Sequence, residues 1–167
     1  FGYDGADGSG SPLDRIELKG FETATHASGV IAIVAYGFDI RVQFIDSMGN
    51  LLGTTKTVNT TMEGQQGQPS VSLLDDGFVV SWATSGAANT NLNGIYAQRF
   101  DSNGNKVGAE IQIAQNDGAI VPTVQELANG NVVIAWKQGN GLYAQYFDSD
   151  LNAISSPIKV ESNAHSE

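Results

Sequence analysis

The chain has 167 residues, with 8 Lys and Arg against 18 Asp and Glu and no cysteine. Its formal charge of -10 repels phosphate backbones and anionic lipid, so nucleic acid and membrane surfaces are poor partners. A chain without thiols has neither disulfide chemistry nor a thiolate metal site. The acidic balance remains compatible with Ca²⁺, which binds carboxylate and carbonyl oxygens.

The 20 glycines and the charged fraction of 16% favour many short strands joined by turns. The chain begins with Phe1 instead of Met, so we expect a processed or excised piece of a longer protein. Tyr3-Asp4, a glycine-rich turn and Ile16-Glu17-Leu18 match the end of a repeat, which makes residues 1–19 a trailing half-repeat. No apolar run approaches the roughly 18 residues that span a bilayer, and we predict no membrane insertion.

A unit of about 50 residues then recurs, which indicates a repeat architecture. The repeats are predicted at residues 20–59, 60–115 and 116–162, with a tail at 163–167. In each repeat one strand ends in an aromatic residue and the next ends in Asp. The aromatic ends are Tyr36, Trp82 and Trp136, and the acidic ends are Asp46, Asp101 and Asp148. With one strand before and one after, each repeat predicts a four-stranded antiparallel meander.

Side-chain alternation in these strands leaves both faces of each sheet largely apolar. Phe78, Val80 and Trp82 face one way, and Val79 and Ser81 the other. A sheet with one wet face would alternate more cleanly, whereas propeller blades are covered on both faces. We therefore predict an all-β, β-propeller-like array of three four-stranded repeats plus a half, with a β-trefoil or a β-prism as alternatives. Such an array cannot close a ring alone, so another chain, a second copy or the rest of a longer protein would complete it.

The turn after the third strand carries oxygen-rich side chains. In the second repeat Asp101, Asn103 and Asn105 resemble the start of an EF-hand calcium loop. No Glu completes such a loop at its twelfth position, where Gln112 stands, so a plain turn capped by Asp is the preferred interpretation. A second candidate calcium site lies among the first glycines of the chain, at Asp4 and Asp7.

The second repeat alone inserts a long polar loop at residues 84–93, which is our best candidate for ligand specificity. Its candidate ligand-binding residues are Ser85, Asn89, Asn91 and Asn93, and a tolerated surface insertion is the alternative.

Two recurrent side chains have both a binding and a structural interpretation. Trp82 could stack on a sugar ring, but its alternation with Val makes core packing the preferred role. The recurrent Gln43, Gln98 and Gln145 could read a ligand, but we prefer that they satisfy backbone groups inside the array.

No motif points to catalysis. His26 and His165 lie far apart, and there is no Gly-x-Ser-x-Gly elbow, His-Glu-x-x-His pair or phosphate-binding loop. Carboxylates are plentiful, but no glycosidase-like pair is singled out. We therefore predict a protein without catalytic residues, and not an enzyme.

The repeat reads Pro-Ser-Val-x-x-Leu-x-Asp-Gly-Phe-Val-Val-x-Trp and then Gly-Ile-Tyr-Ala-Gln-Arg-Phe-Asp. It resembles a repeat of very large secreted bacterial proteins, which include RTX-type calcium-binding proteins and adhesins. The match is close over residues 68–114, good over 122–160 and partial over 23–58. This resemblance implies export to the cell surface or the medium.

Three functions remain open from the sequence. The first is a non-catalytic extracellular module that binds polysaccharide or a cell-surface partner, with Ca²⁺ assistance as an option. The second is a structural spacer or assembly subunit of a surface layer or filament. The third is an accessory domain of a secreted hydrolase.

Overall fold

The computed structural model describes residues 21–26, 29–35, 38–46, 48–115 and 118–160. These residues form β-strands and one short 3₁₀ turn, η1, without an α-helix. The elements are β1 (Phe21–His26), β2 (Gly29–Ala35), β3 (Ile40–Ile45), β4 (Leu51–Thr57), β5 (Gln65–Leu74), β6 (Gly77–Ser85), η1 (Thr90–Leu92), β7 (Gly94–Asp101), β8 (Lys106–Gln115), β9 (Ala119–Glu126), β10 (Val132–Gln138), β11 (Gly141–Phe147) and β12 (Ile158–Val160). Within the described ranges, no helix is long and apolar enough to cross a membrane.

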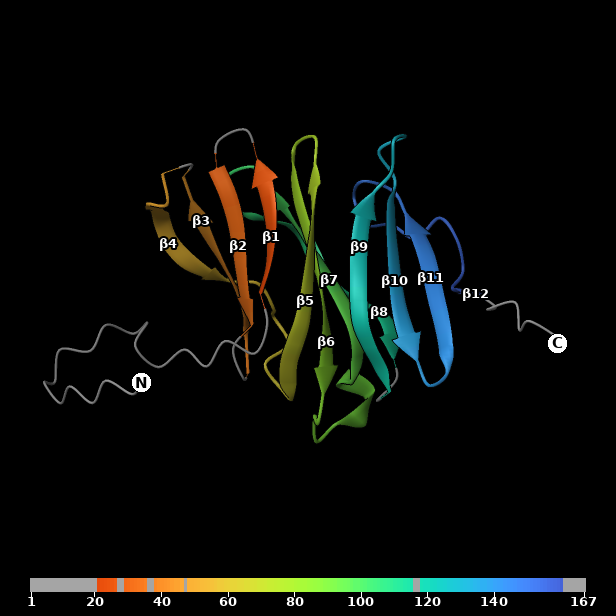
Figure 1. Cartoon of the computed structure of the whole chain (residues 1–167). Helices are drawn as coiled ribbons and strands as arrows, with labels where there is room; N and C mark the ends of the chain where they lie inside the picture. Colours follow the sequence, from red (N-terminus) through yellow and green to blue (C-terminus); the bar gives the residue numbers. More distant parts are fainter. Residues whose placement is uncertain (1–20, 27–28, 36–37, 47, 116–117, 161–167) are drawn as a thin grey trace, which may run out of the picture.

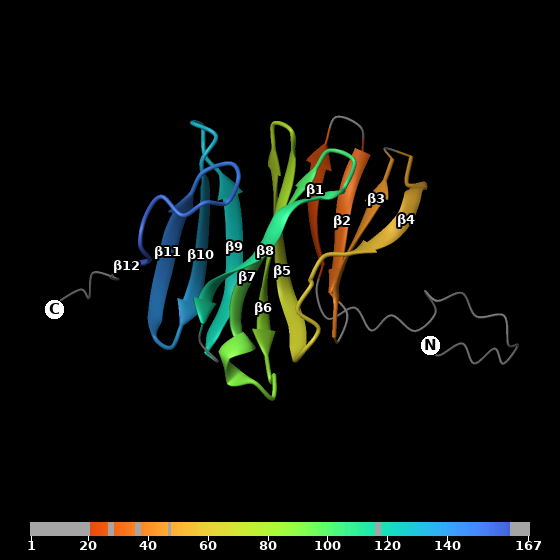
Figure 2. The same cartoon turned by 180° about the vertical axis from the view of Figure 1, so that it is seen from behind.

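The strands form three four-stranded antiparallel sheets, each a meander of consecutive strands. We call them blade 1 (β1–β4), blade 2 (β5–β8) and blade 3 (β9–β12). In Figure 1 the blades stand side by side, with the first strands β1, β5 and β9 next to one another. The outer strands β4 and β12 lie at opposite sides of the molecule, as Figure 2 also shows from behind. The predicted all-β class and four-stranded meanders are therefore confirmed.

The sheet boundaries fit the repeat pattern of the sequence. Each blade lies inside one of the ranges 20–59, 60–115 and 116–162. The half-repeat expected at residues 1–19 and the tail at 163–167 lie outside the described residues. The tight β5–β6 hairpin depends on Gly77, because a Cβ atom there would collide with the carbonyl oxygen of Phe100.

Blade 2 is buried on both faces, and the alternation in β6 explains why. Its residues Phe78, Val80 and Trp82 are at most 1% exposed and pack in one cluster with Ile40 and Val42 of blade 1. The aromatic rings of this cluster contribute strongly, since each buried aromatic side chain removes about 150–250 Å² from water. The alternation in the sequence placed these three residues on one common face of β6, and that face contacts blade 1.

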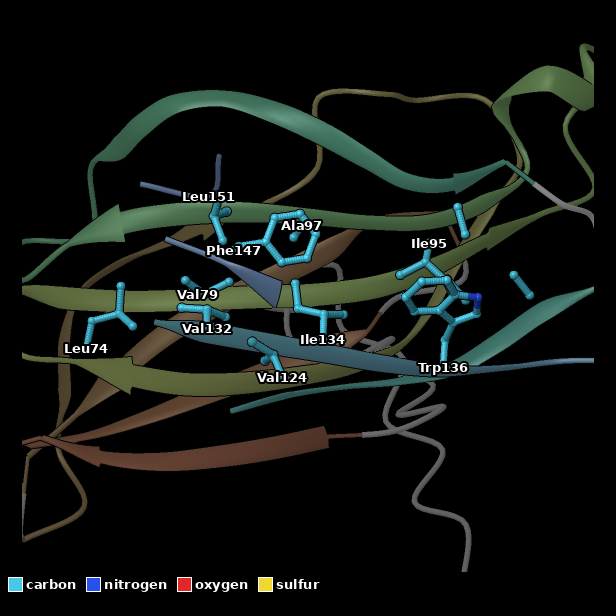
Figure 3. Close-up of a cluster of buried hydrophobic side chains, with 13 residues drawn as sticks. Leu74, Val79, Ile95, Ala97, Val124, Val132, Ile134, Trp136, Phe147 and Leu151 are labelled. Carbon is cyan, nitrogen blue, oxygen red and sulfur yellow. The ribbon is translucent and has the colours of Figure 1, made fainter. Parts of the chain in front are cut away.

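The opposite face of β6 meets blade 3. Val79 belongs to a cluster with Val132, Ile134 and Trp136 of β10, and Figure 3 shows these side chains converging between the two blades. The remaining buried members of this cluster are Leu74, Ala83, Ile95, Ala97, Ala114, Ala119, Val124, Phe147 and Leu151. The sandwiching of blade 2 between two neighbours follows directly from the strict period of 2 along its strands.

Blade 1 departs from the predicted alignment by two residues. The recurrent Gln of the third strand pairs with Ala32 in β2 and with Val80 in β6. Two positions further along, Val34 is therefore the counterpart of Trp82. Tyr36, which was predicted as that counterpart, lies outside the described residues. Aligning the repeats on their aromatic residues therefore gave the wrong counterpart in blade 1, because register is set by strand pairing and not by aromatic character.

The recurrent Gln closes a bulge between the third and fourth strands. The β7–β8 register shifts at Gln98, and Gly108 on the facing strand has a φ of 70°. The Gln98 Nε2 donates to the carbonyl oxygens of Val107 at 3.2 Å and Gly108 at 3.4 Å, where the bulge interrupts the ladder. Gln43 and Gln145 donate in the same way to carbonyl oxygens of their own blades. The structural interpretation of this Gln is therefore supported.

Replacing Gln98 by Ala is expected to lower the free energy of unfolding by about 1–3 kcal/mol, because the buried Gln98 amide is lost and carbonyl groups at a partly buried bulge lose their donor. Urea denaturation followed by Trp fluorescence measures the change. Gln125→Ala is the matched control, since Gln125 is exposed and its amide donates only to the adjacent Glu126 carbonyl. Equal midpoints for the two variants would contradict the role assigned to Gln98.

Candidate functional site

A cavity of about 230 Å³ lies between the start of β5, the end of β6 and the start of β9. It is lined by Gln65, Gln66, Gly67, Gln68, Ala83, Ser85 and Ile120. Blade 2 supplies most of this lining and blade 3 supplies Ile120, so the cavity belongs to the boundary between two blades.

Two unusual backbone conformations shape the cavity. Gln68 and Val121 each precede a proline and have φ values of 53° and 52°. Residues before proline are normally extended, and a left-handed φ is unfavourable for a β-branched residue. The pairing of β5 with β6 and of β9 with β10 shifts register at these same places, so each first strand carries a bulge there. The Gln68 Oε1 accepts the Val121 N–H at 2.8 Å and joins the two bulges.

Three lining side chains have polar groups that no hydrogen bond within the described part of the chain uses. They are the amide of Gln65, the Nε2 of Gln68 and the hydroxyl of Ser85. All three residues are exposed, so these groups are available to a ligand. Ala83 and Ile120 give the same cavity an apolar surface.

The side-chain amide of Gln66, in contrast, forms hydrogen bonds within the fold. It is 2% exposed, and its Oε1 accepts from the Trp82 Nε1 at 3.0 Å and from the Thr84 hydroxyl at 2.5 Å. Its Nε2 donates to the Glu63 carbonyl oxygen at 2.9 Å. Gln66 therefore lines the cavity as a structural residue and is not assigned a ligand-binding role.

Trp82 is part of the core and not a platform for a sugar. Its side chain is fully buried, and its ring stacks on Tyr96 with centroids 5.9 Å apart. The structure therefore contradicts the ligand-binding role considered for Trp82, because neither face of a 0% exposed indole can meet a ligand. The preferred core role is the correct one.

The inserted loop is held in shape by its own asparagines. The Asn89 Oδ1 caps η1 by accepting the Asn91 N–H at 3.2 Å. The Asn93 Oδ1 accepts the Ala87 N–H at 3.0 Å, and Asn93 is only 1% exposed. The Asn91 Oδ1 accepts from the Gln115 Nε2 at 2.8 Å. These three predicted ligand-binding residues are thus brought together by the loop fold, and only Ser85 of the predicted set lines the cavity.

The acidic turns have the same hydrogen bonds in all blades. The Asp101 carboxylate accepts the N–H groups of Asn103 at 2.9 Å and Asn105 at 2.8 Å, and the Asn105 side-chain amide at 3.0 Å. Asp46 and Asp148 make the same set of contacts within their turns. Hydrogen bonds from the Asn at the fifth turn position are the main cause that lowers the pKa of all three carboxyl groups.

Through these hydrogen bonds, Asp101, Asn103 and Asn105 stabilise the turn itself. Among the described residues, no group of three or more His, Cys, Asp or Glu is placed to hold a metal ion. The other candidate calcium ligands, Asp4 and Asp7, lie outside the described residues. A calcium site in this chain therefore stays a prediction.

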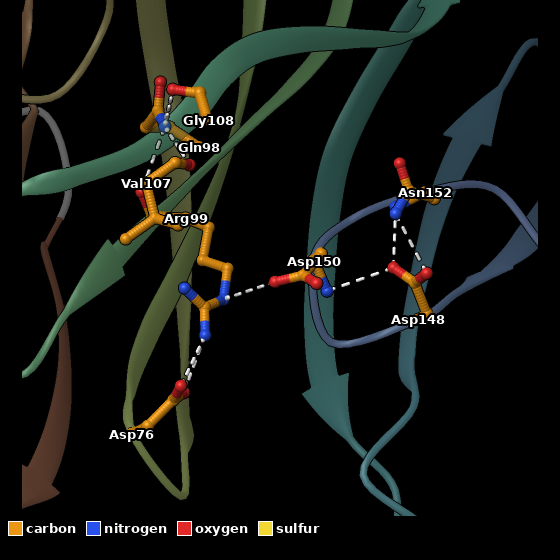
Figure 4. A network of polar contacts seen from close by, with 8 residues as sticks. All are labelled: Asp76, Gln98, Arg99, Val107, Gly108, Asp148, Asp150 and Asn152. Carbon is orange, nitrogen blue, oxygen red and sulfur yellow. Dashed lines mark hydrogen bonds and ion pairs between the residues drawn. The ribbon is translucent and has the colours of Figure 1, made fainter.

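A buried arginine links blades 2 and 3 on the side of the acidic turns. Arg99 is 6% exposed, and its Nη2 donates to both carboxylate oxygens of Asp76 at 2.7 Å. Its Nε lies 4.0 Å from the Asp150 carboxylate of blade 3, as Figure 4 shows. Both acidic partners are about 70% exposed, so solvent screens the pairs and they fix geometry more than stability. Neither Asp76 nor Arg99 was among the site residues predicted from the sequence.

The fold and the blade-boundary cavity define an all-β propeller-like protein. Among solved structures, the chain matches a GH43 endo-arabinanase from Bacillus licheniformis with a TM-score of 0.55 and 11% identity. The match covers 87% of this chain and 60% of that chain, so this chain spans less than two thirds of the enzyme's length. That identity shows a shared fold and leaves activity open. No family model and no curated protein matches the sequence.

The propeller-like prediction is confirmed by this match, whereas the prediction of a non-enzyme is wrong. One solved structure that shares the fold, the GH43 endo-arabinanase, is itself a glycoside hydrolase. The error has a physical origin: glycoside hydrolysis uses two carboxyl groups brought together in space, and no local sequence motif is needed to place them. The absence of nucleophile elbows and metal motifs therefore did not exclude catalysis.

Sequence reasoning missed most of the cavity. Gln65, Gln68 and Ile120 were not singled out, because their proximity depends on the packing of β5 against β9. One usable signal was present, since an Xaa-Pro pair recurs within the first strand of both the second and the third repeat, at Pro69 and Pro122. Those pairs mark the two bulges.

The acidic turns predict a pH dependence of stability. Their folded pKa values lie below the ordinary Asp value of 3.8, so their stabilisation is fully present above that value and is lost as pH falls through the folded values. Thermal unfolding measured downward from about pH 5 should show a falling midpoint. The triple variant Asp46→Asn, Asp101→Asn, Asp148→Asn should flatten this dependence. Asp75→Asn, in an exposed turn, is the control, and equal slopes for both would refute the assignment.

Proposed function

We propose that this chain is the carbohydrate-binding part of a propeller protein, and that the cavity between β5, β6 and β9 takes a sugar residue of a neutral polysaccharide. The observation that carries the proposal is the combination of uncommitted polar groups and apolar surface in one cavity. The polar groups belong to Gln65, Gln68 and Ser85. The apolar surface belongs to Ala83 and Ile120.

This combination suits the chemistry of a sugar ring. Ring hydroxyls pair with amides and with serine hydroxyls, which can both donate and accept, while the C–H face of the ring contacts apolar side chains. The cavity of about 230 Å³ is smaller than the ~300–1,000 Å³ typical of drug-sized ligands, so we assign it about one sugar unit.

The net charge of the chain indicates which class of polysaccharide it can bind. A protein with a net charge of -10 repels polyanionic polymers, so a neutral polymer is the better ligand. One solved structure that shares the fold is named an endo-arabinanase, and arabinan is therefore the first polymer to test. Such polymers lie outside cells, which agrees with the export that the repeat resemblance implies. We extend the proposal to an extracellular or cell-surface location on that basis.

Hydrolysis of the bound polymer is the second candidate function, favoured by the activity named for that same structure. Glycosidases need two carboxyl groups at the scissile bond. Among the described residues, none that lines the cavity is Asp or Glu, so a catalytic pair would have to include residues beyond this lining.

Isothermal titration with arabino-oligosaccharides tests the binding proposal. Gln65→Ala and Ser85→Ala are each expected to weaken binding roughly 2–10-fold, which corresponds to the loss of one hydrogen bond. Thr54→Ala on the exposed strand β4 is the matched control and should bind like the original protein. Unchanged affinity in both cavity variants, or no binding to any neutral glycan of an array, would refute the proposal.

Two added arms separate the related hypotheses. Titration with Ca²⁺ and with EDTA tests whether the predicted ion at Asp4 and Asp7 assists binding. Release of reducing ends from arabinan, measured on the same samples, tests hydrolysis. A structural spacer would give neither binding nor release.

A further inference from the structure

Side-chain oxygens of β5 accept a row of hydrogen bonds from the backbone of β9, its neighbour in blade 3. The Ser70 Oγ accepts the Val124 N–H at 3.2 Å, and the Ser72 Oγ accepts the Glu126 N–H at 2.9 Å. Because β9 is an edge strand of its sheet, N–H groups that point away from β10 need partners outside that sheet. Along this boundary blade 3 therefore supplies the donors and blade 2 supplies the acceptors.

Gln68 continues this row at the cavity. Its Oε1 accepts the Val121 N–H at 2.8 Å, where the left-handed φ of 52° at Val121 accompanies the break in β9–β10 pairing. Turning the Gln68 amide over would set its NH₂ group against this N–H and leave the backbone donor without an acceptor. The contact with Val121 therefore gives the Gln68 amide one favourable orientation.

That orientation decides what Gln68 offers to a ligand. Its Nε2 is the part of the amide that no hydrogen bond within the described part of the chain uses, and an amide NH₂ group can only donate. Gln65 and Ser85 differ, because no such contact fixes the amide of Gln65 or the hydroxyl of Ser85. These two groups can turn to donate or to accept, whereas the donor of Gln68 has a set direction.

Apolar surface adjoins the fixed donor. Ile120 precedes Val121 in the chain, lines the same cavity and is 37% exposed. A ligand oxygen at this place receives a hydrogen from the Gln68 Nε2 and finds no acceptor on the Ile120 side chain. Such a position suits an oxygen that accepts there without donating.

We propose that Gln68 sets the polarity of ligand binding, so that the ligand oxygen facing its Nε2 is a hydrogen-bond acceptor. A ring or glycosidic oxygen can fill this place, and so can a hydroxyl whose own proton goes to Gln65 or Ser85. This role rests on the proposed binding of a sugar in the cavity and names the residue that orients it. Val121, which is not among the lining residues, is a positioning residue that acts through Gln68.

The substitution Gln68→Glu tests the polarity with little change of shape. A carboxylate still accepts the Val121 N–H, but it presents an acceptor where Nε2 was a donor. We expect affinity for arabino-oligosaccharides at least about tenfold below that of the original protein at about pH 7. Protonation returns an O–H donor, so the loss should shrink to about threefold at about pH 4.5, close to the ordinary Glu pKa of about 4.3. Isothermal titration measures both affinities.

The surroundings of Gln68 keep this pH response simple to interpret. None of the described residues that line the cavity is ionisable. Glu63 lies just before the lining residues of β5, and Lys137 of β10 pairs with Ile120. The original protein, titrated over the same pH range, corrects for any effect of these two groups.

Two further Glu substitutions are the matched controls. Gln65→Glu places the same charge in the same cavity, at a group that can already accept, so its affinity should stay within about threefold of the original at both pH values. Gln125→Glu adds the charge at an exposed position of β9 outside the cavity lining and should bind like the original protein. Far-UV circular dichroism at both pH values checks that every variant is folded.

Singly deoxygenated ligands identify the oxygen that faces Gln68. If it is a hydroxyl, removing that hydroxyl and substituting Gln68→Ala should together weaken binding no more than either change alone. If Gln68→Ala weakens binding but is additive with every deoxygenation, the acceptor is the ring or glycosidic oxygen. A Gln68→Ala protein that binds like the original would contradict the proposal.

The outcomes separate this role from the sugar site itself. Equal binding by Gln68→Glu and the original protein at about pH 7 would overturn the polarity assigned to Gln68 and leave the site standing. Weak binding by a folded Gln68→Glu protein at both pH values would overturn it too, because a restored donor would then have no effect. An original protein that binds no neutral glycan would remove the site, and the role of Gln68 with it.

Discussion

The packing of one sheet against the next is the constraint on which the rest of this structure depends. A four-stranded meander with apolar side chains on both faces cannot stay in water alone, and in repeat proteins such units are stabilised by their neighbours. Blade 2 illustrates this, since Phe78 and Val79 are adjacent in β6 yet are buried against different blades. Blade 2 is therefore both a core element and half of two interfaces.

The candidate site is a consequence of this packing. Because the first strands β5 and β9 are neighbours, bulges at equivalent places in the two strands come together, and Gln68 bonds directly to Val121. The left-handed conformations at these residues are unfavourable by themselves and persist because the surrounding sheets hold them. A regular blade boundary thus becomes a cavity where the repeat departs from ideal pairing. The same scaffold supports an enzyme in the solved structure that it resembles.

Features that depend on residues close in sequence could be predicted. The alternation in β6 predicted two buried faces, and the Asp101 turn was correctly interpreted as a capped turn, since its hydrogen bonds span at most four residues. Alignment by residue type failed for Tyr36, because pairing with β3 sets the register of β2. Polarity in the inserted loop was interpreted as binding capacity, whereas Asn93 uses its side chain to hold the loop itself.

The sequence by itself determined the repeat, the strand order within each blade and the chemistry of the turns, because periodicity and short-range hydrogen bonding express them locally. Only the tertiary structure decided which polar side chains of the described residues have no hydrogen bond there, and where a cavity forms. Those properties depend on contacts between residues a whole repeat apart, as with Gln68 and Val121, which are 53 positions apart. No local pattern encodes such a pair, because both partners acquire their positions only when one blade packs against the next.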